Sequence, residues 1–259
     1  MLTPEQVEHF NAFGFLVLRQ VFTADEAETI ERETTEIFDE ARGGKPYAGE
    51  QEAIQPFWER RPFMAGLVAD DRIYGLGHDI LGPDFFLDVT EGWLHTGSTT
   101  WHGGGLHAEG LPHIKISFYI QPLTRETGAL RVVPGSHIRG KPDLLTPLRE
   151  QCGDLDFKPF GIAQSEIPSF PLESQPGDVT IFTESILHAS FGGVDGRFQH
   201  ALTWVRTPVK DEEFAQVRRS YETTRFSYRP CQSSIDSDNP RIRQAVKPLI
   251  DMGFEPHDL

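Results

Sequence analysis

The stretch that decides the fold is "HIKISFYIQPLTRETGALRVVPGSH", residues His113–His137. Its first eight residues alternate in character, as expected for a β-strand, whose successive side chains point to opposite faces. We expect the apolar face to pack on a helical layer and the polar face to line a cavity, although an outer strand facing solvent would show the same pattern. One face carries Ile114, Ile116, Phe118 and Ile120, and the other carries His113, Lys115, Ser117 and Tyr119.

Similar short apolar runs lie on both sides of this stretch and are separated by glycine and proline turns. They are "FFLDVTEGWLH" (Phe85–His95), "GDVTIFTESILHASF" (Gly177–Phe191) and "HALTWVRTPV" (His200–Val209). Regularly spaced short strands with turn signals between them are typical of a β-sandwich or barrel. The sequence therefore predicts a mainly β protein.

The start of the chain has a different pattern, which indicates helices. Thr3 and Gln6 form a capping box in front of a helix that begins at Pro4. A strand is expected at Gly14–Phe22, and a second helix, capped by Thr23, should follow it to about residue 41.

These patterns divide the chain into three parts. Residues 1–84 are mainly helical, residues 85–209 form the β core, and residues 210–259 are a polar, weakly amphipathic extension that wraps the core or covers the site. The whole length, 1–259, suits one domain.

Composition excludes several classes of partner. The formal net charge is −15, so the chain repels nucleic-acid polymers and anionic membranes. No apolar run is long enough to cross a bilayer, and "MLTPEQVEHF" does not resemble a signal peptide. The two cysteines, Cys152 and Cys231, lie far apart in sequence, so we expect no disulfide framework and a cytoplasmic location.

Two histidines and an arginine suggest a metal site. His102 follows a tryptophan at the end of a predicted strand, His188 lies at the end of a distant strand, and Arg197 follows a glycine-rich turn. Two imidazoles and a carboxylate form the facial arrangement that holds Fe(II) and leaves positions open for substrate and O₂. An arginine nearby could bind the carboxylate of an organic co-substrate through two parallel hydrogen bonds.

Three segments carry a resemblance to a known family: "TTWHGGG" (Thr99–Gly105), "TRETGALRVVPGSH" (Thr124–His137) and "PGDVTIFTESILHASFGG" (Pro176–Gly193). They resemble the phytanoyl-CoA dioxygenase family of Fe(II)/2-oxoglutarate oxygenases, and the likeness extends to about Val205. This resemblance implies a double-stranded β-helix, a cupin-like jelly roll, with the metal and 2-oxoglutarate inside it.

The resemblance also implies roles for single residues. His102 and His188 match the metal-binding histidines, and Arg197 matches the arginine that binds the distal carboxylate of 2-oxoglutarate. Ser190, two residues past His188 and on the same strand face, could assist that binding. Lys115 is a further candidate for contact with the co-substrate.

The chain departs from the family at one position. Relatives usually read Trp-His-x-Asp, with the aspartate as third iron ligand, but Gly104 stands there. A halogenase explains this best, because chloride could take the vacated coordination position and supply the missing negative charge. A hydroxylase could instead use the carboxylate of Glu109, in the pair formed with His107. A noncatalytic small-molecule binding barrel is the third explanation.

The substrate is expected to be a free small molecule, and scattered arginines favour a nucleotide because they could meet a phosphate. The remaining histidines are interpreted as surface or structural residues, apart from His113 and His200, which could face the cavity. These arginines are Arg61, Arg72, Arg125 and Arg225, and the structural histidines are His9, His78, His95, His137 and His257.

Overall fold

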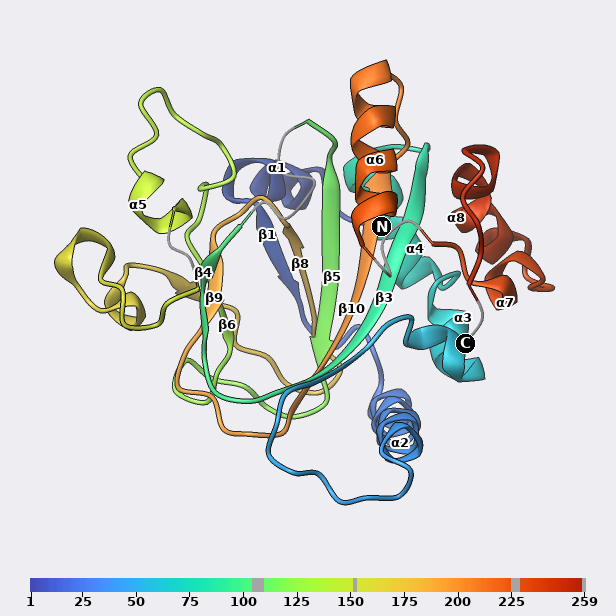
Figure 1. Cartoon of the computed structure of the whole chain (residues 1–259), viewed down its shortest axis with the longest axis horizontal. Coiled ribbons are helices and arrows are strands. Elements are labelled where there is room, and N and C mark those ends of the chain that lie inside the picture. The colour runs from blue at the N-terminus through green and yellow to red at the C-terminus, as the bar shows by residue number, and fades with distance from the viewer. Residues whose placement is uncertain (104–109, 151–152, 225–228, 258–259) are drawn as a thin grey trace.

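The computed structural model consists of two antiparallel sheets that face each other, with most helices covering the larger one (Figure 1). It describes residues 1–103, 110–150, 153–224 and 229–257. In the larger sheet the order is β1 (Phe15–Leu18), β8 (Val179–Thr183), β5 (His113–Tyr119), β10 (Arg197–Arg206), β3 (Phe85–His95) and β2 (Glu52–Ile54). In the smaller sheet it is β4 (Thr99–His102), β9 (His188–Ser190), β6 (Leu130–Val132) and β7 (Phe170–Pro171). This arrangement is the predicted jelly roll.

The first two helices begin where the sequence supplies capping groups. Thr3 and Gln6 form the predicted capping box in front of α1. Thr23 caps α2 as predicted, and Glu26 completes a second capping box there. The helices are α1 (Pro4–Phe13), α2 (Ala24–Ala41), α3 (Pro62–Leu67), α4 (Asp71–Leu81), α5 (Thr146–Arg149), α6 (Asp211–Thr223), α7 (Gln232–Ile235) and α8 (Pro240–Asp251). Short 3-10 turns add η1 (Trp58–Arg60), η2 (Pro159–Gly161) and η3 (Gln164–Glu166).

The first strand is shorter than the predicted Gly14–Phe22. Gly14 ends α1 with φ +83°, a left-handed conformation that glycine adopts without strain. At the other end Gln20 has φ +51°, and its backbone N–H donates to the buried carboxylate of Asp178. Two turns therefore limit the strand to Phe15–Leu18.

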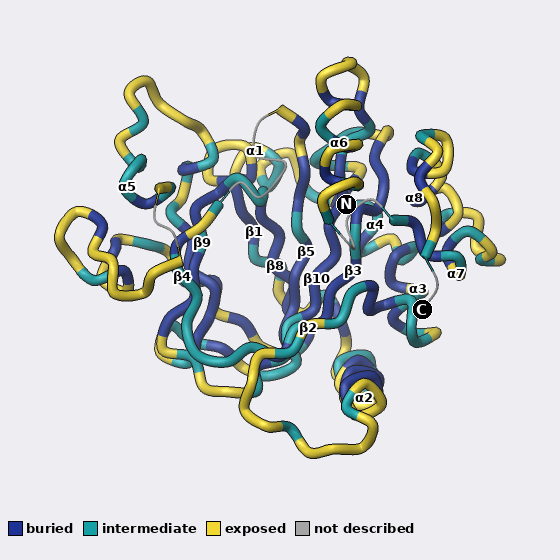
Figure 2. Tube along the Cα trace, in the orientation of Figure 1, coloured by how far each residue is buried: buried dark blue, intermediate teal, exposed yellow. Residues whose placement is uncertain are grey.

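The alternation in β5 separates the core from a cavity. Ile114, Ile116 and Phe118 are buried in the main hydrophobic core, which also contains residues of α2, α3 and α4. On the other face Lys115 and Tyr119 line a cavity between the sheets. Figure 2 shows β5 buried between its neighbours, so an outer strand facing solvent is the wrong interpretation.

The C-terminal extension packs on the side of the larger sheet. Helix α8 lies against β3, and α6 contributes Val217 to a small apolar cluster with Val205 of β10 and Leu249 of α8 (Figure 1). The sequence left two positions open for this extension, around the core or over the site. Its described part packs around the core. Among the described residues, no helix combines the length and apolar character needed to span a bilayer. The cytoplasmic location stays a prediction.

Candidate active site

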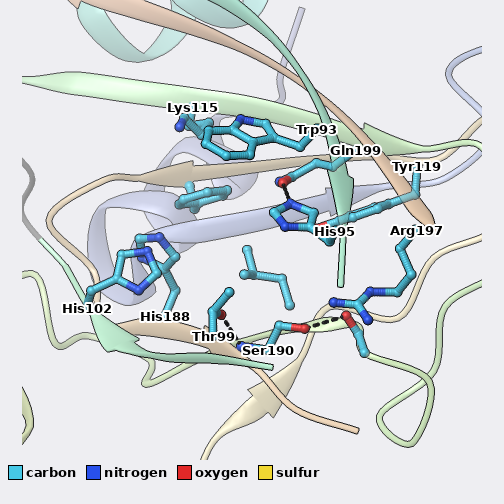
Figure 3. Close-up of a pocket in the computed structure, with 13 residues that line it drawn as sticks. Trp93, His95, Thr99, His102, Lys115, Tyr119, His188, Ser190, Arg197 and Gln199 are labelled. Carbon is cyan, nitrogen blue, oxygen red and sulfur yellow. Dashed lines mark hydrogen bonds between the residues drawn. The ribbon is translucent and has the colours of Figure 1, made fainter. Parts of the chain in front are cut away.

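The candidate active site is the cavity between the two sheets (Figure 3). Strands of both sheets contribute to its wall, which includes four of the predicted residues: His102, His188, Ser190 and Arg197. Lys115, the fifth predicted residue that the structure describes, lines it as well. The remaining lining residues are Trp93, His95, Thr99, Tyr119, Gly128, Leu130, Phe182 and Gln199.

The two histidines of the predicted metal site come together through strand pairing. β4 lies antiparallel to β9 with His102 opposite His188, and the ring centroids are 4.1 Å apart. His102 Nδ1 lies 2.8 Å from the carbonyl of Thr100, and His188 Nδ1 lies 2.9 Å from that of Ile186. Because a carbonyl only accepts, each Nδ1 carries the proton, which leaves each Nε2 with a lone pair for a metal.

The surroundings keep both imidazoles neutral, which is the form that binds metals. Burial lowers the pKa of His188 to about 3, and His102 beside it adds to the effect. Surrounding protein atoms also lower the pKa of His102, although part of that residue remains exposed. Both rings therefore lack the proton that would compete with a cation.

Arg197 lies at the other end of the cavity, away from the histidine pair (Figure 3). Its Nη1 and Nη2 donate to the carbonyls of Val194 (2.8 Å) and Gly97 (2.9 Å), and the residue is only 2% exposed. Burial lowers its pKa, yet an arginine stays charged in proteins. No ion pair to Arg197 is formed within the part of the chain that the structure describes. A buried cation without a paired carboxylate suits an anionic co-substrate.

Two glycines make the space that Arg197 occupies. A Cβ at Gly193 would stand 1.5 Å from Nη1 of Arg197, and a Cβ at Gly128 would stand 2.8 Å from its Nε. Gly128 also has φ +96°. Gly128 of the "TRETGALRVVPGSH" segment thus makes room for the Arg197 side chain, a role that the segment's letters alone did not reveal.

Ser190 and Thr99 connect the smaller sheet at the cavity wall. Ser190 Oγ donates to the carbonyl of Gly128 (2.8 Å), and its backbone N–H donates to Thr99 Oγ1 (2.9 Å). The hydroxyl proton of Ser190 is therefore already used in a hydrogen bond within the protein. Its predicted contact with 2-oxoglutarate stays a prediction.

Lys115 is held by two carboxylates. Its Nζ lies 2.7 Å from Glu91 Oε2 and 3.0 Å from Glu184 Oε1. Burial alone would lower the pKa of Lys115, but Glu184 and Glu91 outweigh it and raise that pKa. The ammonium is charged and already paired, so Arg197 is better placed to bind a carboxylate. The contact predicted for Lys115 stays a prediction.

Several cavity residues were missed by sequence reasoning, and His95 is the clearest case. It was interpreted as structural, but it lines the cavity with Trp93, Tyr119 and Gln199. Two histidines considered for the cavity lie elsewhere, since neither is among its lining residues. His200 is packed in the core, where its Nε2 lies 2.9 Å from Thr34 Oγ1, and His113 is buried 3.4 Å from Glu184 Oε2.

Residues 104–109 lie outside the described part of the chain, so the predictions for Gly104, His107 and Glu109 are not resolved by geometry. Within the described residues, no group of three His, Cys, Asp or Glu side chains is arranged to hold a metal. Gly103 is explained by packing alone, since a Cβ there would stand 2.5 Å from the carbonyl oxygen of Ile186.

Iron(II) and 2-oxoglutarate fit this cavity. The free Nε2 atoms of His102 and His188 are donors suited to iron, and the cradled guanidinium of Arg197 suits a carboxylate. A jelly roll with these features defines an iron(II)- and 2-oxoglutarate-dependent oxidoreductase, which uses O₂ as its oxidant.

Comparison with known proteins agrees with this class. The model of the phytanoyl-CoA dioxygenase (PhyH) family matches residues 10–195, so the chain belongs to that family. An ectoine dioxygenase of Sphingopyxis alaskensis is 23% identical over 223 residues, covering 74% of this chain and 72% of the relative.

Solved structures share the fold at low identity. HygX from Streptomyces hygroscopicus, with nickel and 2-oxoglutarate bound, has a TM-score of 0.64 at 22% identity, covering 80% of this chain and 88% of that chain. SnoK, a non-heme alpha ketoglutarate dependent carbocyclase from nogalamycin biosynthesis, has a TM-score of 0.60 at 19% identity, covering 80% of this chain and 85% of that chain. Proteins of one fold thus carry different reaction names.

Proposed function

We propose that this oxygenase halogenates an unactivated C–H bond of a free small molecule. The observation that carries the proposal is Gly104, a residue without a side chain at the position where relatives place a carboxylate ligand. Packing accounts for the neighbouring Gly103, whereas Gly104 lies outside the described residues. A site held by His102 and His188 alone leaves room for chloride, whose charge would replace that of the carboxylate.

The chain's own residues position the reactants. His102 and His188 would hold the iron through Nε2, because their Nδ1–H groups are fixed on backbone carbonyls. Arg197 would orient 2-oxoglutarate along the cavity. When bound, the iron with 2-oxoglutarate and O₂ supplies the oxidising power for the C–H bond. The protein would determine which C–H bond of the substrate lies nearest to the iron and whether a halide binds there.

Hydroxylation is the second candidate, and it fits the comparisons as well. Curated relatives bear the name ectoine dioxygenase, and dioxygenase is the name of the family itself. In this reading Glu109 or water would take the third position. A noncatalytic binding barrel no longer fits, because the chain belongs to a family of enzymes and keeps His102, His188 and Arg197 together in one cavity.

The arginines that favoured a nucleotide substrate do not line the cavity where they are described. Arg61 pairs with Glu36 and Glu40, and Arg72 pairs with Glu26 and Asp70. Neither of them lines the cavity, and neither does Arg125, while Arg225 lies outside the described residues. A free small molecule stays the proposal, and ectoine is a reasonable first compound to assay because of the curated relatives.

The experiment compares the unmodified enzyme with Gly104→Asp. Product is analysed by mass spectrometry with chloride or bromide present and with halide rigorously absent. We expect halogenated product from the unmodified enzyme, and hydroxylated product or inactivity from the variant, whose carboxylate would exclude the halide. If the unmodified enzyme gives only hydroxylated product at high chloride, the halogenase proposal is wrong and the hydroxylase is the better one.

A further inference from the structure

His95 projects into the middle of the cavity, between the histidine pair and Arg197 (Figure 3). It ends β3, where it lies opposite Arg197 of β10. Its ring stacks on that of Trp93, with centroids 5.6 Å apart and planes inclined by 6°. The orientation of this imidazole is therefore fixed before any ligand enters.

A chain of hydrogen bonds fixes the tautomer of His95. Gln199 Nε2 donates to Ser117 Oγ (2.8 Å), so the amide oxygen of Gln199 faces His95 Nε2 at 2.7 Å. With the amide in this orientation its oxygen accepts from His95, so Nε2 carries the proton. Burial lowers the pKa of His95, which keeps the ring neutral. The other nitrogen, Nδ1, is then a bare acceptor.

This acceptor is buried and has no hydrogen-bond partner among the described residues. 2-Oxoglutarate cannot satisfy it, because at neutral pH its carboxylates and keto group offer acceptors only. The primary substrate is the remaining reactant in this cavity. A buried acceptor that meets a donor only when substrate arrives discriminates strongly against compounds that lack the donor.

We infer that His95 Nδ1 accepts a hydrogen bond from the primary substrate, which therefore carries an O–H or N–H group. The inference rests on the proposed function only in placing substrate and 2-oxoglutarate in one cavity. It applies to halogenation and hydroxylation alike, so product analysis and the test of His95 can fail independently.

The tautomer can be tested without any substrate. Histidine-selective nitrogen NMR of the zinc-loaded protein distinguishes a bare Nδ1 from a protonated one, and His95→Phe assigns the signal by removing it. We expect a bare Nδ1 both before and after addition of 2-oxoglutarate. A protonated Nδ1 in either state would overturn the inference, because His95 would then be a donor to 2-oxoglutarate.

The donor requirement is tested with a panel of free amino acids and amino alcohols, each beside its fully O- and N-methylated form. Stimulated 2-oxoglutarate consumption is measured for the unmodified enzyme, His95→Phe, His95→Gln and the control His78→Phe, which alters an exposed histidine of α4. We expect stimulation by donor-bearing compounds only, reduced about tenfold in His95→Phe and partly restored by the amide oxygen of His95→Gln.

The affinity for 2-oxoglutarate gives the second readout, measured by calorimetry on the nickel-loaded protein. It should change by less than about twofold in His95→Phe, since the inferred contact is with the substrate. Equal stimulation by methylated compounds, or a loss of about tenfold in 2-oxoglutarate affinity, would overturn the inference.

Discussion

At the scale of single residues, the site depends on which side-chain nitrogens donate hydrogen bonds to backbone carbonyls. The carbonyls of Thr100 and Ile186 accept hydrogen bonds from Nδ1–H of His102 and His188, respectively. Each Nε2 is thereby left with its lone pair for a metal. Backbone carbonyls of Val194 and Gly97 hold two nitrogens of Arg197. Local hydrogen bonds therefore prepare the side chains before any ligand binds, which limits the cost of ordering them on binding.

Removing either histidine should abolish stable metal binding. His102→Ala and His188→Ala each remove one imidazole of the adjacent pair, and one nitrogen ligand does not hold Fe(II) firmly. Iron content after anaerobic loading and desalting measures the effect, with His78→Ala on the exposed face of α4 as control. Full iron binding by either cavity variant would contradict the assignment.

Replacing Arg197 should weaken 2-oxoglutarate binding more than metal binding. A charge-assisted hydrogen-bonded pair contributes about 1.5–3 kcal/mol, which corresponds to a loss of affinity of about tenfold or more in Arg197→Ala. Calorimetric titration of the metal-loaded protein checks this, with the same substitution at the surface residue Arg243 as control. If 2-oxoglutarate affinity is unchanged, Arg197 does not bind the carboxylate, and Lys115 is the other cationic side chain among the described residues that line the cavity.

At the scale of elements, strand pairing brings the site together. β4 and β9 place the two histidines side by side, and the turn between β9 and β10 carries Gly193, one of the two glycines beside Arg197. Sequence reasoning found these three residues because strand-end histidines and a family motif mark them. It missed His95, since a strand histidine looks the same whether it faces solvent or a cavity, and only the position of the opposite sheet decides between them.

The limits of the first strand show the same problem. The apolar run from Gly14 to Phe22 predicts a strand, but the left-handed turn at Gln20 is stabilised by Asp178, a residue distant in sequence. Capping boxes of α1 and α2 were predictable because both partners lie three residues apart. Local signals could be recognised in the sequence, whereas partners distant along the chain could not.

The turn before β10 can be tested by adding one methyl group. Gly193→Ala places a Cβ 1.5 Å from the present position of Arg197 Nη1, so the guanidinium must move. We expect 2-oxoglutarate affinity to fall by about tenfold or more with little change in metal binding. Gly66→Ala in α3 is the matched control, because nothing lies within 4 Å of its new Cβ. Equal affinities in both variants would show that Gly193 is not needed to seat Arg197.

At the scale of the whole molecule, a second buried histidine joins the helical layer to the barrel. His200 of β10 donates through Nε2 to Thr34 Oγ1 of α2, whose hydroxyl in turn donates to the carbonyl of Ile30. The ring lies between Phe57 and Phe118, and burial lowers its pKa from 6.5 to about 3. The interface between α2 and the larger sheet therefore requires a neutral imidazole.

This requirement predicts how stability depends on pH. Below about pH 6.5 the unfolded chain binds a proton at His200 that the folded chain refuses until about pH 3, so the free energy of unfolding falls as the pH falls through this window. The contribution of this residue is about 1.4 kcal/mol per pH unit.

Urea unfolding of the metal-free protein at several pH values gives the slope of the free energy of unfolding against pH. His200→Gln should be less stable near neutral pH but should show a slope smaller by about one proton, while the exposed control His78→Gln keeps the slope of the unmodified protein. An unchanged slope in His200→Gln would mean that His200 is not the group that couples protonation to the packing of α2 on the barrel.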